Sequence, residues 1–200
     1  LSKSEKAKGC EEVYKITGGN VITMTDPEKK GKKAKKAWTF TRCFGGESCQ
    51  EDIFTSKEEG VPDAGQLMRS VIDGFNVAIF AYGQTGSGKT FTMSGAKTPN
   101  GKLLGVSPRA VCRLYELMGE LKRTRDMEFE VSMYMIELYM SDLTDLLDFN
   151  PDAEPKKLRP KKDAKTGIIH IDGAKEVDVT SKEEVMGLFD KGMTARHTAS

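Results

Sequence analysis

One short run of residues sharply narrows the choice of folds for this chain. Residues 83–90 read Gly-Gln-Thr-Gly-Ser-Gly-Lys-Thr and match the phosphate-binding pattern G-x-x-x-x-G-K-[ST]. Glycines let the backbone wrap closely, so several N–H groups can point at phosphate oxygens. In this pattern the lysine reaches the β- and γ-phosphates and the last hydroxyl coordinates Mg²⁺, whereas the alternative is a flexible loop of glycine and serine. The sequence favours nucleotide binding, with these candidate residues: Gly83, Gln84, Thr85, Gly86, Ser87, Gly88, Lys89 and Thr90.

The residues on either side of this run supply the context that the pattern requires. Residues 77–82 form a nearly continuous apolar run, which predicts a strand buried on both faces, as in a parallel sheet. Residues 91–93 can begin a short helix. Upstream, the apolar residues of 61–75 recur at helical spacing, with Pro62 suited to the first turn and Gly74 to the exit. Strands that alternate with helices predict the α/β class.

The rest of the chain also carries element signals. Residues 12–17 and 21–25 flank the turn signal Gly18-Gly19-Asn20 and predict a hairpin. Ser107-Pro108 predicts the start of one helix, and a capping box at 180–184 predicts the start of another. Further strands are predicted at 38–44, at 129–135 and twice within 168–179, and loops are predicted at 94–105 and 150–167.

Composition and charge exclude several classes of protein. Lys and Arg total 31 against 30 for Asp and Glu, so the formal charge of +1 excludes a nucleic-acid binder that acts through bulk charge. The lysine-rich runs contain no interleaved aromatic residues, which disfavours a base-stacking surface. No apolar run approaches the roughly 18 residues of a membrane span. The four cysteines form no C-x-x-C pair, which favours reduced structural thiols over a zinc site.

Other candidates for chemistry are weak. Asp142, Asp145 and Asp148 lie among leucines that predict a short helical turn, and we interpret them as exposed polar positions. No residue plainly orients an attacking water, so we assign no catalytic residue within this chain. Met135 and Met140 are expected to fill the core.

A longer stretch around the phosphate loop, residues 70–93, resembles the kinesin motor domain family almost position by position. Further matches follow in the family's order along the chain, at 38–44 with 50–54, 105–109, 137–139 with 145–147, and 196–200. Residues 75–82 and 137–143 look most like C-terminal-motor kinesins, including the plant-type calmodulin-binding branch. The resemblance covers nearly the whole chain.

The resemblance implies an ATP-hydrolysing microtubule motor with a P-loop NTPase fold, in which helices cover both faces of a mixed, mainly parallel central sheet. Residues 1–200 would be the N-terminal part of the motor domain, with the family's first strand expected before Leu1 and both switch motifs expected after Ser200. The complete domain would be a microtubule-stimulated ATPase, whereas we expect the segment alone not to support normal turnover. Two alternatives stay open: a nucleotide-regulated microtubule-binding protein with little or no ATPase, and an unrelated phosphate-loop enzyme such as a small-molecule kinase.

The resemblance also implies a cofactor. ATP or ADP with Mg²⁺ is expected on residues 83–90, with Thr90 holding the metal. Phe91 is expected against the base, and core packing is the alternative for this ring.

Finally, the resemblance implies partners and a location. The partner is tubulin in microtubules, without nucleic acid or membrane, and the location is cytoplasmic and microtubule-associated. Any dimerisation of the full-length protein would run through segments outside these residues. The lysine-rich run 29–36 is a second candidate filament contact, with a solvated loop or a nuclear-localisation signal as alternatives. The main candidates, for which a solvated loop is the alternative, are Lys156, Lys157, Arg159, Lys161, Lys162 and Lys165.

Overall fold

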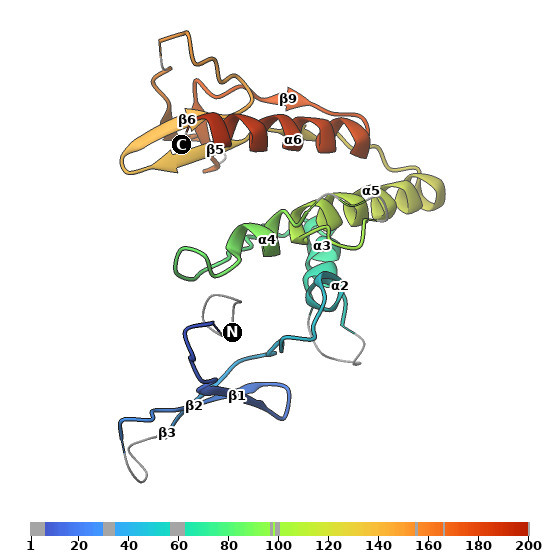
Figure 1. Ribbon diagram of the computed structural model, residues 1–200. Coiled ribbons are helices and arrows are strands. Elements are labelled where there is room, and N and C mark those ends of the chain that lie inside the picture. Colours follow the sequence, from blue (N-terminus) through green and yellow to red (C-terminus); the bar gives the residue numbers. More distant parts are fainter. Residues whose placement is uncertain are drawn as a thin grey trace. The chain divides into compact units, whose positions relative to one another are not determined.

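A computed structural model describes residues 7–29, 35–56, 63–96, 98, 101–154, 156–165 and 167–199. The chain divides into two compact units, and Figure 1 labels most of their elements. The N-terminal unit consists of Leu1–Ser70 and Asn76–Ser107, and the C-terminal unit of Val71–Phe75 and Pro108–Ser200. The phosphate loop therefore belongs to the N-terminal unit, and the basic loop, defined here as residues 156–165, belongs to the C-terminal unit. Across the described ranges, no helix has the length and apolarity needed to cross a membrane.

A small antiparallel sheet opens the N-terminal unit. It contains β1 (Tyr14–Thr17), β2 (Val21–Thr25) and β3 (Lys35–Thr39) in that order, and β1 and β2 form the predicted hairpin. The strand predicted at 38–44 is wrong beyond Thr39. There the backbone folds back onto the hairpin turn, and the N–H of Cys43 donates to the carbonyl oxygen of Gly19 at 2.7 Å. Most of the run 29–36 lies outside the described residues.

Three helices of the N-terminal unit surround the phosphate loop in sequence: α2 (Gln50–Phe54), α3 (Ala64–Ile72) and α4 (Lys89–Met93). The helix predicted over 61–75 is confirmed in its centre, although positions 61 and 62 lie outside the described residues. Gly74 has a φ of 94°, which suits a residue just beyond a helix end. The predicted loop at 94–105 holds an isolated antiparallel bridge between Gly95 and Leu104.

The C-terminal unit combines two long helices with short antiparallel strand pairs. Helix α5 (Val106–Arg125) begins one residue before the predicted Ser107 cap, so that cap is wrong. Pro108 is still accommodated, because the first-turn N–H groups of a helix have no helical partners. The strand pairs are β4 (Ser132–Met133) with β9 (Val177–Asp178), β5 (Ile136–Tyr139) with β6 (Asp142–Asp145), and β7 (Arg159–Lys162) with β8 (Ile169–Asp172). The last helix is α6 (Lys182–Ala199).

Four expectations for this unit are wrong. One is that Asp145 is an exposed polar position, because Asp145 is only 6% exposed. The short helical turn predicted for the aspartates is strand β6, which returns from β5 through a turn, and the predicted loop 150–167 contains strand β7. Met140, expected in the core, is 83% exposed because it lies at the β5–β6 turn with a φ of 53°. The predicted strands within 168–179 are confirmed as β8 and β9.

The capping box predicted for α6 is confirmed with one difference in partner. The N–H of Glu184 donates to the Ser181 hydroxyl at 3.3 Å, as a capping box requires. The Glu184 carboxylate accepts from the N–H of Thr180, one residue earlier than the usual partner, at 2.7 Å. The core of the unit includes Leu117, Leu146 and Leu147, which are almost fully buried.

The apolar run before the phosphate loop does not form the expected buried strand. Residues 77–82 form no helix or strand, although their alternating exposure is that of an extended backbone, and none of the described strands pairs with them. Their exposure alternates, with Phe80 88% exposed and Tyr82 fully exposed. A strand of a parallel sheet needs ladder partners on its edges and cover on both faces, and the described strands supply neither. Every described strand pair is antiparallel.

Candidate nucleotide-binding site

The glycines of residues 83–90 give this loop its shape. Gly88 has a φ of 92° and is the N-cap of α4, where a side chain would strain the left-handed backbone. At Gly83 a Cβ atom would lie 2.5 Å from the Ser87 hydroxyl oxygen, so a larger residue would fill the turn. The backbone thus leaves a close-approach surface of the kind that phosphate groups need.

The side chain of Lys89 folds back over the loop that it follows. Its Nζ atom donates to the carbonyl oxygens of Gly83 at 2.8 Å and Gln84 at 2.9 Å. These contacts fix the ammonium group beside the loop backbone while leaving it a further N–H to donate. Lys89 is therefore positioned as the fixed positive charge that a phosphate-binding loop requires.

Thr90 and Phe91 occupy the first turn of α4. Thr90 is exposed, and its carbonyl oxygen accepts from the N–H of Ser94 at 2.8 Å, which closes the short helix. The Phe91 side chain is 47% exposed, so a large part of the ring remains open to a stacking partner. Roles in metal and base binding for these two residues stay predictions.

Gln50 contacts the candidate residue Phe91, and sequence reasoning missed this contact. It is 4% exposed, and its Nε2 atom donates to the carbonyl oxygen of Phe91 at 2.6 Å, which ties α2 to α4. Its Oε1 atom is buried and has no hydrogen-bond partner among the described residues. The polar side chain joins positions 41 residues apart, and no local pattern in the sequence reports such a contact.

The cations of the basic loop do not form one continuous surface. Lys156 binds the carboxylate of Asp148. In the β7–β8 hairpin, Arg159 and Lys161 share one face, and Lys162 lies on the other. Lys165 lies in the following turn, where its N–H donates to the Asp163 carboxylate at 2.9 Å.

Electrostatics around Lys156 reflect its contact with Asp148. The hydrogen bond from the Lys156 ammonium lowers the pKa of Asp148, and the same bond raises the pKa of Lys156. Both groups therefore stay charged across the neutral range, and Lys156 is not an unattached cation.

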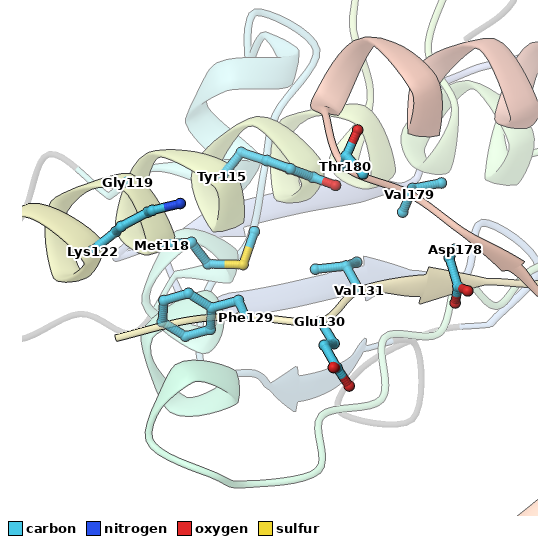
Figure 2. A pocket seen from close by; sticks show the side chains of 10 residues that line it. All are labelled: Tyr115, Met118, Gly119, Lys122, Phe129, Glu130, Val131, Asp178, Val179 and Thr180. Atoms are coloured by element: carbon cyan, nitrogen blue, oxygen red, sulfur yellow. The ribbon is translucent and has the colours of Figure 1, made fainter. Parts of the chain in front are cut away.

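A separate pocket of about 670 Å³ lies within the C-terminal unit and contains none of the predicted site residues. Figure 2 shows Tyr115 and Met118 of α5 along one side of it, with Phe129 and Val131 across from them. The Tyr115 hydroxyl is buried without a hydrogen-bond partner among the described residues, and this burial raises the pKa of Tyr115. Within the described ranges, no cluster of three or more His, Cys, Asp or Glu residues is arranged to hold a metal ion.

Comparisons with known proteins agree with the resemblance seen in the sequence. The kinesin motor domain family matches residues 1–200. The kinesin-like protein KIN-14Q of Oryza sativa subsp. japonica is 41% identical over 184 residues, which cover 92% of this chain and 18% of that protein. The kinesin-like protein KIN-14G of Arabidopsis thaliana is 38% identical over 196 residues, which cover 98% of this chain and 18% of that protein.

A solved structure of a fast kinesin also resembles this chain. It aligns with a TM-score of 0.81 at 28% identity, over 99% of this chain and 51% of the solved chain. The chain therefore spans about half of that chain and 18% of the length of the two curated relatives.

Proposed function

Because this chain belongs to the kinesin motor domain family, we propose that it forms part of an ATP-hydrolysing microtubule motor. The family and the P-loop NTPase fold class predicted from the sequence are both confirmed. The observation that supports nucleotide binding most directly is the placement of Lys89 across the glycine-shaped loop. The proposed cofactor is ATP or ADP with Mg²⁺.

The residues of this chain would bind and orient the nucleotide. When bound, ATP supplies the γ-phosphoryl group that is transferred to water. The backbone N–H groups of the loop and the Lys89 ammonium would hold the phosphates, and the Thr90 hydroxyl would hold Mg²⁺. Phe91 would stack on the base, and the hydrogen bond from Gln50 to its carbonyl oxygen would hold its backbone in place. We propose no catalytic residue within residues 1–200, because the sequence offers no plain candidate for the group that orients an attacking water.

The proposed partner is the microtubule, contacted through the basic loop. The exposed side chains of strand β7 support this assignment, because Arg159, Lys161 and Lys162 present positive charge to solvent. An acidic filament surface would attract these cations, and added salt would weaken the attraction. On this proposal the protein acts on microtubules in the cytoplasm, without nucleic acid or membrane as a partner.

ATP turnover of the intact protein, measured as phosphate release with and without microtubules, tests the proposal. A motor requires that saturating microtubules accelerate turnover. Cosedimentation with microtubules but negligible turnover would instead support the nucleotide-regulated binder. The match to the kinesin motor domain family over residues 1–200 argues against the unrelated phosphate-loop enzyme.

A further inference from the structure

The buried carboxylate of Asp145 contacts both ends of the segment that contains the basic loop. Asp145 is 6% exposed, and its Oδ1 atom accepts from the N–H groups of Leu147 at 2.9 Å and Asp148 at 3.2 Å. Its Oδ2 atom accepts from the N–H of Lys175 at 2.6 Å. The two ends of residues 149–174, the segment that contains β7 and β8, are therefore held together at Asp145.

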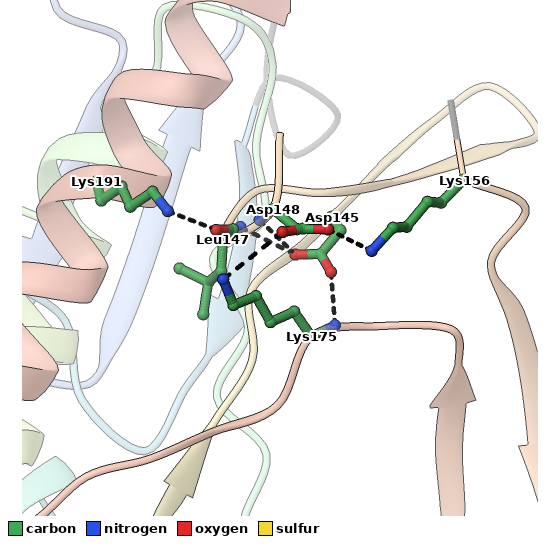
Figure 3. Close-up of polar contacts among 6 residues, drawn as sticks. All are labelled: Asp145, Leu147, Asp148, Lys156, Lys175 and Lys191. Carbon is green, nitrogen blue, oxygen red and sulfur yellow. Dashed lines mark hydrogen bonds and ion pairs between the residues drawn. The ribbon is translucent and has the colours of Figure 1, made fainter. Parts of the chain in front are cut away.

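Asp148 adds a second set of contacts at the same point. Its carboxylate binds the Lys156 ammonium, and its Oδ1 atom lies 3.6 Å from the Nζ atom of Lys175. Helix α6 joins from the other side, where the Nζ atom of Lys191 donates to the carbonyl oxygen of Leu147 at 2.7 Å. Figure 3 shows Lys156 and Lys191 reaching this cluster from opposite directions.

We propose that Asp148 is a positioning residue for microtubule binding, because it fixes the direction in which the basic loop extends from the core of the C-terminal unit. This inference rests on the proposed function, in which the cations of the basic loop contact the filament. Lys156 then forms an intramolecular ion pair with Asp148 and is not a filament contact. The cations left to meet the filament are those of strand β7 and the turn that follows it.

The physical reason is preorganisation. Asp148, Lys156 and Lys175 are all partly exposed, and exposed ion pairs contribute little to overall stability. Their effect is instead to restrict the orientations of a loop that must be ordered when it binds. Without Asp148, the loop would keep its charge but would have to be ordered during binding.

Two physical effects predict opposite results for Asp148→Asn. The substitution removes one negative charge beside a basic loop, so long-range electrostatics alone predicts tighter binding to an acidic filament. Positioning predicts weaker binding, because the contacts to Lys156 and Lys175 are weakened. The sign of the change in Kd therefore separates the two effects.

The experiment is cosedimentation of the intact protein with microtubules at fixed ionic strength, in the presence of a non-hydrolysable ATP analogue. We expect Asp148→Asn to raise the Kd about threefold to tenfold, as for the loss of order in one or two side chains. Asp148→Glu keeps the carboxylate and should restore most of the affinity. Asp152→Asn is the matched control, because it makes the same charge change four residues away, at an exposed position before the basic loop. It should leave the Kd unchanged or lower it.

Three readouts keep a purely structural effect apart from positioning. Asp148→Asn should leave the thermal midpoint and the ATP affinity unchanged while the microtubule Kd rises. If Asp148→Asn fails to fold, Lys156→Met replaces it, with Lys157→Met as its charge-matched control. Lys156→Met should then weaken binding more than Lys157→Met does, and equal losses would overturn the inference.

The outcomes for the inference and for the proposed function differ. If the wild-type protein cosediments but Asp148→Asn binds as tightly or more tightly, the positioning role is wrong and the proposed function stands. An equal loss for Asp148→Asn and Asp152→Asn also overturns the positioning role. If the wild-type protein does not cosediment at all, the proposed function fails and this inference fails with it.

Discussion

At the scale of single residues, Lys89 is the side chain on which the proposed nucleotide binding most depends. We expect Lys89→Met to lower the affinity for ATP about 10- to 100-fold, because hydrogen bonds to a charged group contribute about 1.5–3 kcal/mol. Titration with a fluorescent ATP analogue measures this change. Lys15→Met, at an exposed lysine of β1, is the control and should bind normally. Equal affinity for wild type and Lys89→Met would contradict the assigned role.

Gln50 is the second residue with a specific expectation. Gln50→Met keeps the length of the side chain but removes the donor to the Phe91 carbonyl oxygen, which leaves that acceptor with one fewer partner. We expect the free energy of unfolding to fall by about 1–3 kcal/mol, measured by denaturant titration. Glu51→Gln, at an exposed position of the same helix, should change it little. A neutral Gln50→Met would mean that relief of the unpartnered Oε1 atom offsets the lost bond.

At the scale of elements, sequence patterns correctly predicted structures that depend on interactions between residues close together in the sequence. The hairpin of β1 and β2 and the cap of α6 depend on neighbouring residues, and both were predicted. The Asp145 contacts were missed because they join β6 to Lys175, 30 residues away. The strand predicted at 77–82 was wrong for a related reason, because a buried strand depends on partner strands and not on its own apolar residues alone.

The cap of α6 carries a pH-dependent prediction. The N–H and hydroxyl of Thr180 hold the pKa of Glu184 below its ordinary value of 4.5. A lowered pKa stabilises the fold above the unfolded-state pKa, and this stabilisation is lost as the pH falls through the folded-state pKa. We therefore expect Glu184→Gln to lower the thermal midpoint at neutral pH, with the difference from wild type shrinking as the pH drops below about 4.5.

Thermal unfolding of wild type and Glu184→Gln between about pH 3 and pH 7 measures this dependence. Glu183→Gln is the control, because Glu183 carries the same charge in the first turn of α6 without the contacts to Thr180. Parallel curves for wild type and Glu184→Gln across this range would contradict the prediction.

At the scale of the whole molecule, we expect residues 77–82 to determine whether residues 1–200 self-associate when they are produced alone. Phe80 is 88% exposed, Tyr82 is fully exposed, and none of the described strands pairs with this backbone. An unpaired extended edge with aromatic side chains is a template for pairing with another chain. We therefore expect residues 1–200, produced alone, to self-associate at about micromolar to millimolar concentrations.

Sedimentation velocity over a concentration series measures this association. With Phe80→Lys, self-association should require a higher protein concentration, because a lysine on an exposed edge opposes pairing. Phe75→Lys is the control, because Phe75 is also exposed but precedes the extended run. If Phe75→Lys reduces association as much as Phe80→Lys does, general surface hydrophobicity rather than the unpaired edge drives it. A segment that stays monomeric throughout the series would show that residues 77–82 are covered in solution.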